Sequence, residues 1–424
     1  MDFKWENKTD LMIFYKDLLQ NNFFGFWNKA VDRENGGIFN CFNNAGTELA
    51  SRNKYTWSQG RFVWIWSKLY SMSKRGSLSL DVNILREDVE RSVHFLEKNV
   101  FMENGNCVFL TDEKGNWLES IPGKGFDTSF YADCFVALGF SEYARVFKNR
   151  HYGDLAFRVY RHTVDRLHEE GLRSEPYPIP KGHKFHSVPM IMLNVSEELA
   201  LTLRMLDNER CEEVDNESCG YMREVMEDFY DEGEGRIIEV VRPGADPYDS
   251  VLCRHVNPGH AIEDMWFVMS LAKRKGMAEY IEKAARAVKW AVKTGWDREF
   301  GGLLRFTDVT GGEPRGTRSG DPYETLILDT WDSKLWWPHS EMLYTTLLSY
   351  NLTKDQEFLS LYNMAHEYVF NTFPDKENNT GEWVQIRDRI GNPIDKVVAL
   401  PVKDPYHIMR NIILIIELLE QIQL

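Results

Sequence analysis

Apolar residues recur with a helical period along almost the whole chain. The spacing i, i+3, i+4, i+7, which places apolar side chains on one face of a helix, appears in about twelve segments. Strand and helix do not alternate at the spacing of a βαβ unit, so the pattern argues against a doubly wound sheet. It predicts helices over residues 7–31, 56–75, 83–101, 126–148, 151–170, 186–207, 214–231, 260–275, 277–295, 334–352, 355–371 and 405–422.

The polar segments between these helices resemble one another. "FWNKAVDRENGGIFNCFNNAG" (26–46) is similar to "GWDREFGGLLRFTDVTGG" (295–312) and, more loosely, to residues 373–393. Residues 101–116 are a fainter copy without the Asp-x-Glu. Each segment leaves a helix at an aromatic residue, carries glycines and has a short alternating run. This pattern predicts a small β-hairpin between helices.

Helix pairs joined alternately by short turns and long hairpin loops predict a closed toroid, with six inner helices inside six outer ones. The long loops would then gather on one face, which is the natural mouth of a binding site. Because the repeats run from one end of the chain to the other, we expect a single domain over residues 1–424.

Composition and charge limit the kinds of molecule that the protein is expected to bind. Hydrophobic residues make up 43% and charged residues 27% of the 424, which is typical of a globular protein. The net charge of -15 argues against nucleic acid and against anionic membrane surfaces. Aromatic residues reach 13%, a weak sign of a carbohydrate site, because large helical barrels also use them as core. We therefore expect a small-molecule partner.

The chain lacks the usual signals for export, membrane insertion and metal binding. No basic-then-apolar run opens it and no apolar stretch approaches a membrane span. His183 and His186 lie three apart without further ligands at zinc spacing, so neither a metal nor a cofactor is expected. Six cysteines without a CxxC pair suit reduced thiols in the cytoplasm: Cys41, Cys107, Cys134, Cys211, Cys219 and Cys253.

The first candidate for chemistry is "VLCRHVNPGHAIEDMW" (251–266). Pro258-Gly259 places His260 about where a helix begins, and Glu263 follows three residues later on the same face. An ordinary helix start with an acidic residue near its N-terminus would look the same. If His260 is functional, Glu263 could accept a hydrogen bond from one ring nitrogen and leave the other free.

A second histidine repeats this arrangement. In "LPVKDPYHIMRNI" (400–412), Pro405 precedes His407 at the start of the final helix. A helix that merely begins at proline explains this equally well. In a toroid, however, inner helices begin at the same rim, so His260 and His407 could face each other across a pocket. Two opposed imidazoles can move protons on either face of a flat intermediate near neutral pH.

Two further groups carry polar or aromatic side chains at helix starts. Arg61 lies one helical turn after Trp57 and is either a surface charge or a buried anion-stabilising group. Trp336-Trp337 precede a helix whose first turn holds Glu341. An aromatic pair at such a mouth suits stacking against a sugar ring.

Taken in order, "YTWSQGR", "PMIMLNVSEEL", "RHVNPGHAIE", "GWDREFGG" and "KLWWPHSE" resemble the N-acylglucosamine 2-epimerase family. The matches extend over nearly the whole chain. The resemblance implies an all-α (α/α)6 barrel, in agreement with the twelve helices. It also implies epimerisation or aldose–ketose isomerisation at C2 of a free sugar, through an opened ring and an enediolate.

The resemblance also implies roles for single residues. His260 and His407 take the places of the two proton-transfer histidines, Glu263 that of the carboxylate orienting the first, and Arg61 that of the arginine stabilising the enediolate. The expected substrate-binding residues are Tyr55, Trp57, Asn194, Trp336, Trp337 and Glu341.

The substrate is the least determined part of the prediction. Asn194 and "NPGHAIE" resemble the N-acylglucosamine branch rather than the cellobiose branch, which favours an N-acylhexosamine. The segment before His407 departs from both branches, and the insertion 315–332 would reshape the mouth. An unacylated sugar such as mannose or a mannose/glucose disaccharide stays open, as do an inverting glycoside hydrolase and a non-catalytic relative. A homodimer is a further expectation.

Overall fold

The structure is a computed structural model that describes residues 8–169, 171–244, 249–398 and 400–422. Its α-helices are α1 (Lys8–Asp17), α2 (Phe24–Trp27), α3 (Thr56–Lys74), α4 (Val82–Asn99), α5 (Tyr131–Phe147), α6 (Arg150–Arg166), α7 (Ser187–Met205), α8 (Cys211–Glu224), α9 (Val251–Arg254), α10 (Pro258–Lys275), α11 (Ala278–Gly295), α12 (Pro322–Thr330), α13 (Trp336–Thr353), α14 (Gln356–Thr372) and α15 (Tyr406–Gln421). Two π-helical stretches, η1 (Leu18–Phe23) and η2 (Val225–Phe229), continue α1 and α8.

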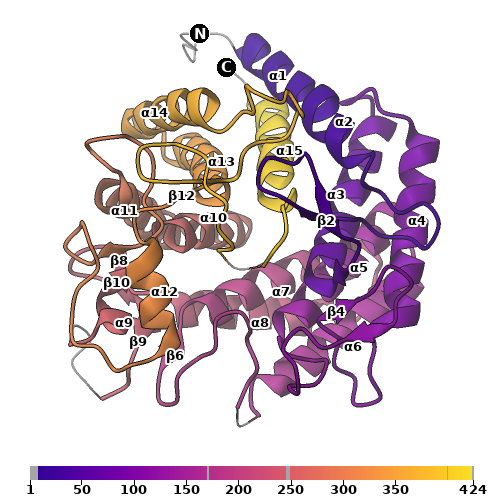
Figure 1. The fold of residues 1–424 in the computed structure, drawn as a ribbon, viewed down its shortest axis with the longest axis horizontal. Helices are drawn as coiled ribbons and strands as arrows, with labels where there is room; N and C mark the ends of the chain where they lie inside the picture. Colours follow the sequence, from indigo (N-terminus) through magenta and orange to yellow (C-terminus); the bar gives the residue numbers. More distant parts are fainter. Residues whose placement is uncertain (1–7, 170, 245–248, 399, 423–424) are drawn as a thin grey trace.

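Six of these helices form an inner ring. In order around it, α3, α5, α7, α10, α13 and α15 each pack against the next, and α15 packs against α3 (Figure 1). Helices α4, α6, α8, α11 and α14 cover the ring from outside, together with the N-terminal run of α1, η1 and α2. All twelve predicted helical segments are present, and the predicted (α/α)6 barrel is confirmed.

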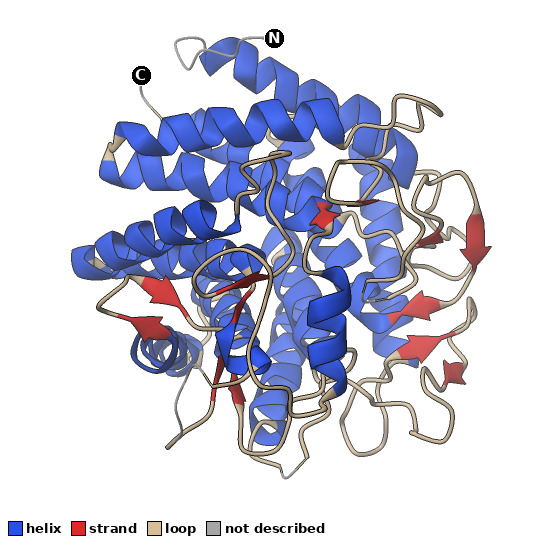
Figure 2. Cartoon of the chain, turned by 60° about the vertical axis from the view of Figure 1, so that its left-hand side comes forward, coloured by secondary structure: helices blue, strands red, loops and turns tan. Residues whose placement is uncertain are grey.

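The strands are short, and most of them join neighbouring repeats. They are β1 (Cys41–Phe42), β2 (Leu49–Ser51), β3 (Lys54–Tyr55), β4 (Leu110–Thr111), β5 (Trp117–Leu118), β6 (Lys184–Phe185), β7 (Tyr230–Asp231), β8 (Arg236–Ile237), β9 (Val240–Val241), β10 (His255–Val256), β11 (Thr307–Asp308), β12 (Lys334–Leu335) and β13 (Ile386–Arg387). The pairs β1–β2, β4–β5 and β7–β8 each lie within one loop. In the four segments where the sequence predicted a hairpin, isolated antiparallel bridges join Val31 to Ile38, Phe101 to Cys107, Trp296 to Leu303 and Pro374 to Trp383. In β3–β4, β6–β9, β10–β11 and β12–β13, by contrast, a strand that leads into an inner helix pairs with the following loop. These strands lie among the loops (Figure 2).

The repeated Asp-x-Glu forms a tight turn in three of the long loops. Asp32 accepts hydrogen bonds from the backbone N–H groups of Glu34 and Asn35, both at 3.0 Å. Asp297 and Asp375 bond the N–H groups two and three residues later in the same way. An aspartate side chain that imitates a backbone turn explains why this residue type recurs at this position.

The insertion 315–332 contains a helix that the sequence pattern did not predict. Asp321 caps α12 by accepting from the N–H of Tyr323 at 2.8 Å, and Pro322 occupies the first turn. These are ordinary helix-start signals in a segment too short to show periodicity. No helix within the described residues is long and apolar enough to cross a membrane.

Candidate active site

One cavity lies where the inner helices begin, and all six of them contribute to its wall. The contributing side chains are, in helix order, Trp57 and Arg61, Tyr131 and Phe135, Met190 and Asn194, His260 and Glu263, Trp336 and Trp337, and Tyr406, His407 and Arg410. Loop residues close the wall on the mouth side, among them Tyr177, Glu239, Arg305 and Val398. The cavity therefore forms only when all six inner helices are in place.

The Pro-Gly pair before His260 serves both the helix start and the cavity. Asn257 caps α10 by accepting from the backbone N–H of His260 at 3.2 Å, and Pro258 fits the first turn, where a helix needs no N–H donor. At Gly259 a Cβ atom would lie 2.4 Å from Cη2 of Trp337. A side chain at this position would push against the indole, which explains the glycine.

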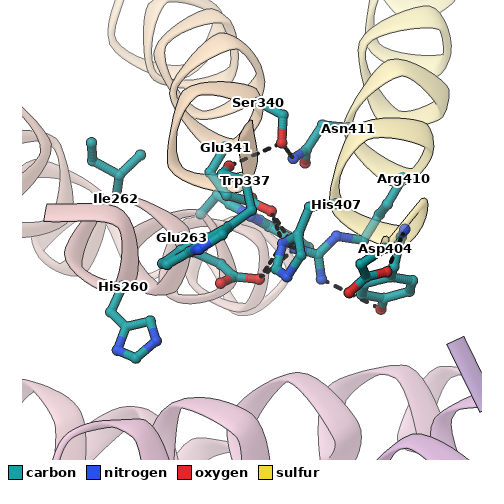
Figure 3. A network of polar contacts seen from close by, with 12 residues as sticks. His260, Ile262, Glu263, Trp337, Ser340, Glu341, Asp404, His407, Arg410 and Asn411 are labelled. Carbon is teal, nitrogen blue, oxygen red and sulfur yellow. Dashed lines mark hydrogen bonds and ion pairs between the residues drawn. The ribbon is translucent and has the colours of Figure 1, made fainter. Parts of the chain in front are cut away.

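His260 is held by a carboxylate that the sequence analysis missed. Its Nδ1 lies 2.7 Å from Oε1 of Glu239, the residue before β9. The expected bond from Glu263 to His260 is therefore wrong. Figure 3 shows the Glu263 carboxylate directed toward His407 and Arg410 instead. With Nδ1–H donated to Glu239, Nε2 is the ring nitrogen left for a ligand.

Glu239 continues into a buried polar chain. The backbone N–H of His186 donates to the Glu239 carbonyl at 2.9 Å, which extends the β6–β9 pair. The His186 ring lies 3.6 Å from the Glu239 carboxylate and 2.7 Å from Oδ2 of Asp264. Burial opposes a charged imidazole, but the two carboxylates outweigh it and raise the pKa of His186 to about 9. His186 is therefore a cation at neutral pH.

His407 has the same arrangement with different partners. Its Nδ1 lies 2.7 Å from Oε1 of Glu341 and 3.6 Å from Oε1 of Glu263. Burial lowers the pKa of His407 to about 3, and Arg61 and Arg410 add to this effect against the opposing charge of Glu263. At neutral pH the ring is neutral, donates Nδ1–H to Glu341 and keeps a lone pair on Nε2.

Arg410 stabilises the carboxylates behind His407. Its guanidinium bonds both Glu263 and Glu341, the latter at 2.6 Å (Figure 3). The oxygen and nitrogen atoms of Glu263, Glu341 and His407 also converge within 4.8 Å, a geometry that could hold a metal ion. Arg410 already supplies the positive charge that such a cluster needs.

Arg61 is buried beside His407, so the surface-charge alternative is wrong. It pairs with Asp404, and its Nη2 lies 3.4 Å from Nε2 of His407. Its guanidinium stacks over Phe135 at 4.1 Å from the ring centroid. This packing holds a fixed positive charge next to the free nitrogen of His407.

Trp337 lies between the two histidines. Its ring centroid is 5.4 Å from that of His260 and 5.4 Å from that of His407. A flat apolar face flanked by two imidazoles is suited to a sugar carbon chain whose reacting centre must be reached from both sides.

Other predicted substrate contacts divide into two groups. Trp57, Asn194, Trp336 and Trp337 line the cavity. Tyr55 and Glu341 are not among the lining residues: Tyr55 packs edge-on against Phe109, and Glu341 is fully buried, where it accepts from the indole N–H of Trp266 at 2.9 Å. Glu341 therefore acts on His407 from behind, and the prediction that these two residues contact the substrate is wrong for this geometry.

The comparisons with known proteins agree with the observed fold. The sequence profile described as N-acylglucosamine 2-epimerase (GlcNAc 2-epimerase) matches residues 37–411. The bovine (Bos taurus) N-acylglucosamine 2-epimerase is 27% identical over 94% of this chain and 88% of its own. A sugar epimerase from a ruminal bacterium superposes with a TM-score of 0.76 at 18% identity, covering 98% of this chain and all of that one. Cellobiose 2-epimerase from Bacillus thermoamylovorans superposes with a TM-score of 0.73 at 19% identity, covering 96% and 99%.

Proposed function

The chain belongs to the N-acylglucosamine 2-epimerase family, and we propose that it epimerises a free N-acylhexosamine at C2. The observation that carries this proposal is the shared arrangement of His260 and His407. Each imidazole gives its Nδ1–H to a buried glutamate, and the two rings flank Trp337 in one cavity.

In the proposed reaction the opened sugar lies against Trp337 with C2 between the two Nε2 atoms. One histidine removes the C2 proton, and the electron pair of the broken C–H bond forms the C1–C2 double bond while the carbonyl π electrons pass to O1. The product is an enolate whose C2 carries the acylamino nitrogen; an unacylated sugar would give an enediolate. The second histidine, in its protonated form, returns a proton to the opposite face of C2 as the O1 electron pair re-forms the carbonyl, which inverts the centre.

The charged neighbours are assigned supporting roles in this proposal. Arg61 stabilises the negative charge that develops on O1 of the enolate, since its own charge is preorganised beside His407. Glu239 and Glu341 stabilise the imidazolium forms of His260 and His407. Glu263 holds Arg410 in place. Trp57, Asn194, Trp336 and Trp337 contact the sugar.

The experiment is incubation with free sugars in D2O, followed by NMR. N-acetylglucosamine, glucose, mannose and cellobiose form the panel. Deuterium at C2 of N-acetylglucosamine together with its C2 epimer supports the proposal, and the same result with glucose, mannose or cellobiose alone points to an unacylated substrate. A ketose product points to the aldose–ketose isomerase. A cleaved disaccharide points to the glycoside hydrolase.

His260→Asn and His407→Asn separate the two faces of C2. Each should abolish net epimerisation, and one should retain exchange of the C2 proton of a single epimer, because one face of C2 still has a histidine. The matched control is His151→Asn, an exposed histidine on α6 that pairs with Glu97. Near-parental epimerisation by either active-site variant would show that the two-histidine mechanism is wrong.

Location and assembly are also proposals. All six cysteines are free, which supports a reducing compartment such as the cytoplasm. The proposed homodimer is tested by light scattering of the purified protein, where a mass of one chain would contradict it.

A further inference from the structure

Arg305 lies on the loop side of the same cavity and is 4% exposed. Its backbone N–H donates to the Ser333 carbonyl at 3.0 Å, next to β12. Its guanidinium donates to Oγ1 of Thr330 at 3.0 Å, to the Val398 carbonyl at 2.8 Å and to the hydroxyl of Tyr177 at 3.4 Å. These three segments come from separate parts of the chain and meet around one cation.

Arg305 differs in its partners from the other two arginines that line this cavity. Arg61 is paired with Asp404, and Arg410 with Glu263 and Glu341. Within the residues that the structure describes, Arg305 forms no ion pair, and all three of its acceptors are uncharged oxygens. A guanidinium has five N–H groups, so three bonds leave two available to a ligand. A buried charge without a counter-ion is costly, and a bound anion would relieve that cost.

The surroundings of Arg305 fit an anion. The three carboxylates of the cavity wall already have positive or hydrogen-bonding partners: Asp404 has Arg61, Glu263 has Arg410, and Glu239 has the two histidines.

One hydroxyl donor accompanies the guanidinium. Tyr177 accepts from Arg305 and donates its own proton to the Val398 carbonyl at 3.3 Å, whereas Tyr323 of α12 also lines the cavity. Burial raises the pKa of Tyr323 well above its usual value, so its hydroxyl keeps its proton at neutral pH.

We propose that Arg305 binds a negatively charged substituent, a carboxylate or a phosphate, on the sugar substrate. The inference rests on the proposed C2 chemistry in this cavity. Because Arg305 contacts the loop segments around Thr330 and Val398, while C2 must reach His260 and His407, the charged group sits on a part of the sugar remote from C1 and C2. The two N–H groups that remain, one on Nε and one on Nη1, can each donate a single charge-assisted hydrogen bond to either oxyanion.

The test compares matched neutral and anionic sugars. N-acetylglucosamine, its 6-phosphate and its 6-carboxylate are titrated into the protein by calorimetry, and C2 deuteration of each is followed in D2O. A charge-assisted pair should make at least one anionic sugar bind ~10- to 100-fold more tightly than the neutral one. The arm with the larger gain distinguishes phosphate from carboxylate.

Substitutions test whether Arg305 causes the preference for anionic sugars. Arg305→Gln should weaken binding of the anionic sugar ~10- to 100-fold and change binding of the neutral sugar by less than about threefold. Arg305→Lys should keep part of the preference. The matched control is Arg318→Gln, an exposed arginine beside α12 that bonds Thr325. It should change nothing.

Two results would overturn the inference. One is a parent protein that binds the neutral sugar as tightly as both anionic ones, a measurement that needs no variant. The other is an Arg305→Gln protein that weakens all three sugars equally, which would make Arg305 a clamp between loops. If an anionic sugar binds through Arg305 but no sugar exchanges its C2 proton, the proposed reaction fails and the anion site stands. If neutral sugars are epimerised and no anionic sugar is preferred, the proposed reaction stands and the anion site fails.

Discussion

His260 and His407 adopt the same tautomer in this cavity, but carboxylates from different elements fix it. His260 donates Nδ1–H to Glu239, which precedes a strand, and His407 donates to Glu341, which lies on an inner helix. In both cases the carboxylate is almost completely buried, so the ring orientation is fixed before any ligand arrives. At the level of single residues, the site is defined by which glutamate holds which histidine.

Glu239→Gln tests this arrangement at His260. An amide can still accept Nδ1–H, but it lacks the charge that stabilises the imidazolium formed during proton transfer. We expect the turnover number for epimerisation to fall ~100-fold with little change in KM. The control is Glu234→Gln, an exposed residue in the preceding turn. A variant with unchanged turnover but raised KM would assign Glu239 to sugar binding instead.

Arg61→Lys tests the proposed contact between Arg61 and the enolate intermediate. A lysine keeps the charge but not the planar fork that reaches Asp404 and the neighbourhood of His407 together. Turnover should therefore fall far more than sugar affinity, by ~100-fold against less than about threefold. The exposed Arg52→Lys is the matched control. Normal turnover in Arg61→Lys would remove Arg61 from the reaction.

At the scale of elements, the start of α10 positions both His260 and the neighbouring Trp337. Gly259→Ala keeps the helix but places a methyl group 2.4 Å from Cη2 of Trp337 and 2.9 Å from Cγ of Pro338. Since Trp337 lies between His260 and His407, its displacement should lower kcat/KM at least ~10-fold and cost ~1–3 kcal/mol of unfolding free energy.

The matched control for Gly259→Ala is Gly220→Ala in α8, where no atom lies within 4 Å of the added Cβ. Alanine favours a helix, so this variant should be neutral or slightly more stable. Enzyme assays and thermal melts of both variants check the prediction. Full activity in Gly259→Ala would mean that the indole can move without harm to the site.

The elements show why the fold was more predictable than the site. Helical periodicity is local, and it located all twelve barrel helices within a few residues. Glu239 lies 21 residues before His260, and only the pairing of β6 with β9 brings it to the ring. No local spacing encodes that contact, whereas Glu263, three residues from His260, suggested a contact that the helix geometry directs elsewhere.

Two features that the sequence analysis missed, Arg410 and α12, do have a local signal in the sequence. Arg410 follows His407 by three residues on the same helix, a spacing that placed both on one face. Asp321-Pro322 is an ordinary helix start, and this pair indicates that a helix begins within the insertion. Arg305 lies inside a recognised repeat, but only the three-dimensional arrangement shows that its acceptors are uncharged.

At the scale of the whole molecule, the ring makes the site depend on both ends of the chain. Helix α15 packs against both α1 and α3, so the first and last helices hold each other. We expect one cooperative unfolding transition, with coincident tryptophan fluorescence and far-ultraviolet circular dichroism curves, as for a single domain. Two separated transitions would instead indicate that parts of the ring fold independently.

The buried chain Asp264–His186–Glu239–His260 gives the molecule a specific response to alkali. The pKa of His186 is about 9 in the folded state and 6.5 in an unfolded chain, so the folded state binds the proton more tightly. This contribution to stability is complete below pH 6.5, falls as the pH rises and is lost above pH 9. Each unit of pKa difference corresponds to about 1.4 kcal/mol.

The paired replacement His186→Met with Asp264→Ala isolates this effect, because it removes the histidine and its fully buried carboxylate partner together. Replacing a buried ion pair by apolar residues is often neutral or stabilising at neutral pH. Between pH 6.5 and 9 the parent should lose unfolding free energy more steeply than the double variant, since tyrosines and cysteines titrate alike in both. Urea unfolding at several pH values measures the two slopes. Equal slopes would mean that His186 carries no proton in the folded protein, and the chain from Asp264 to His260 would then be a neutral hydrogen-bonded support.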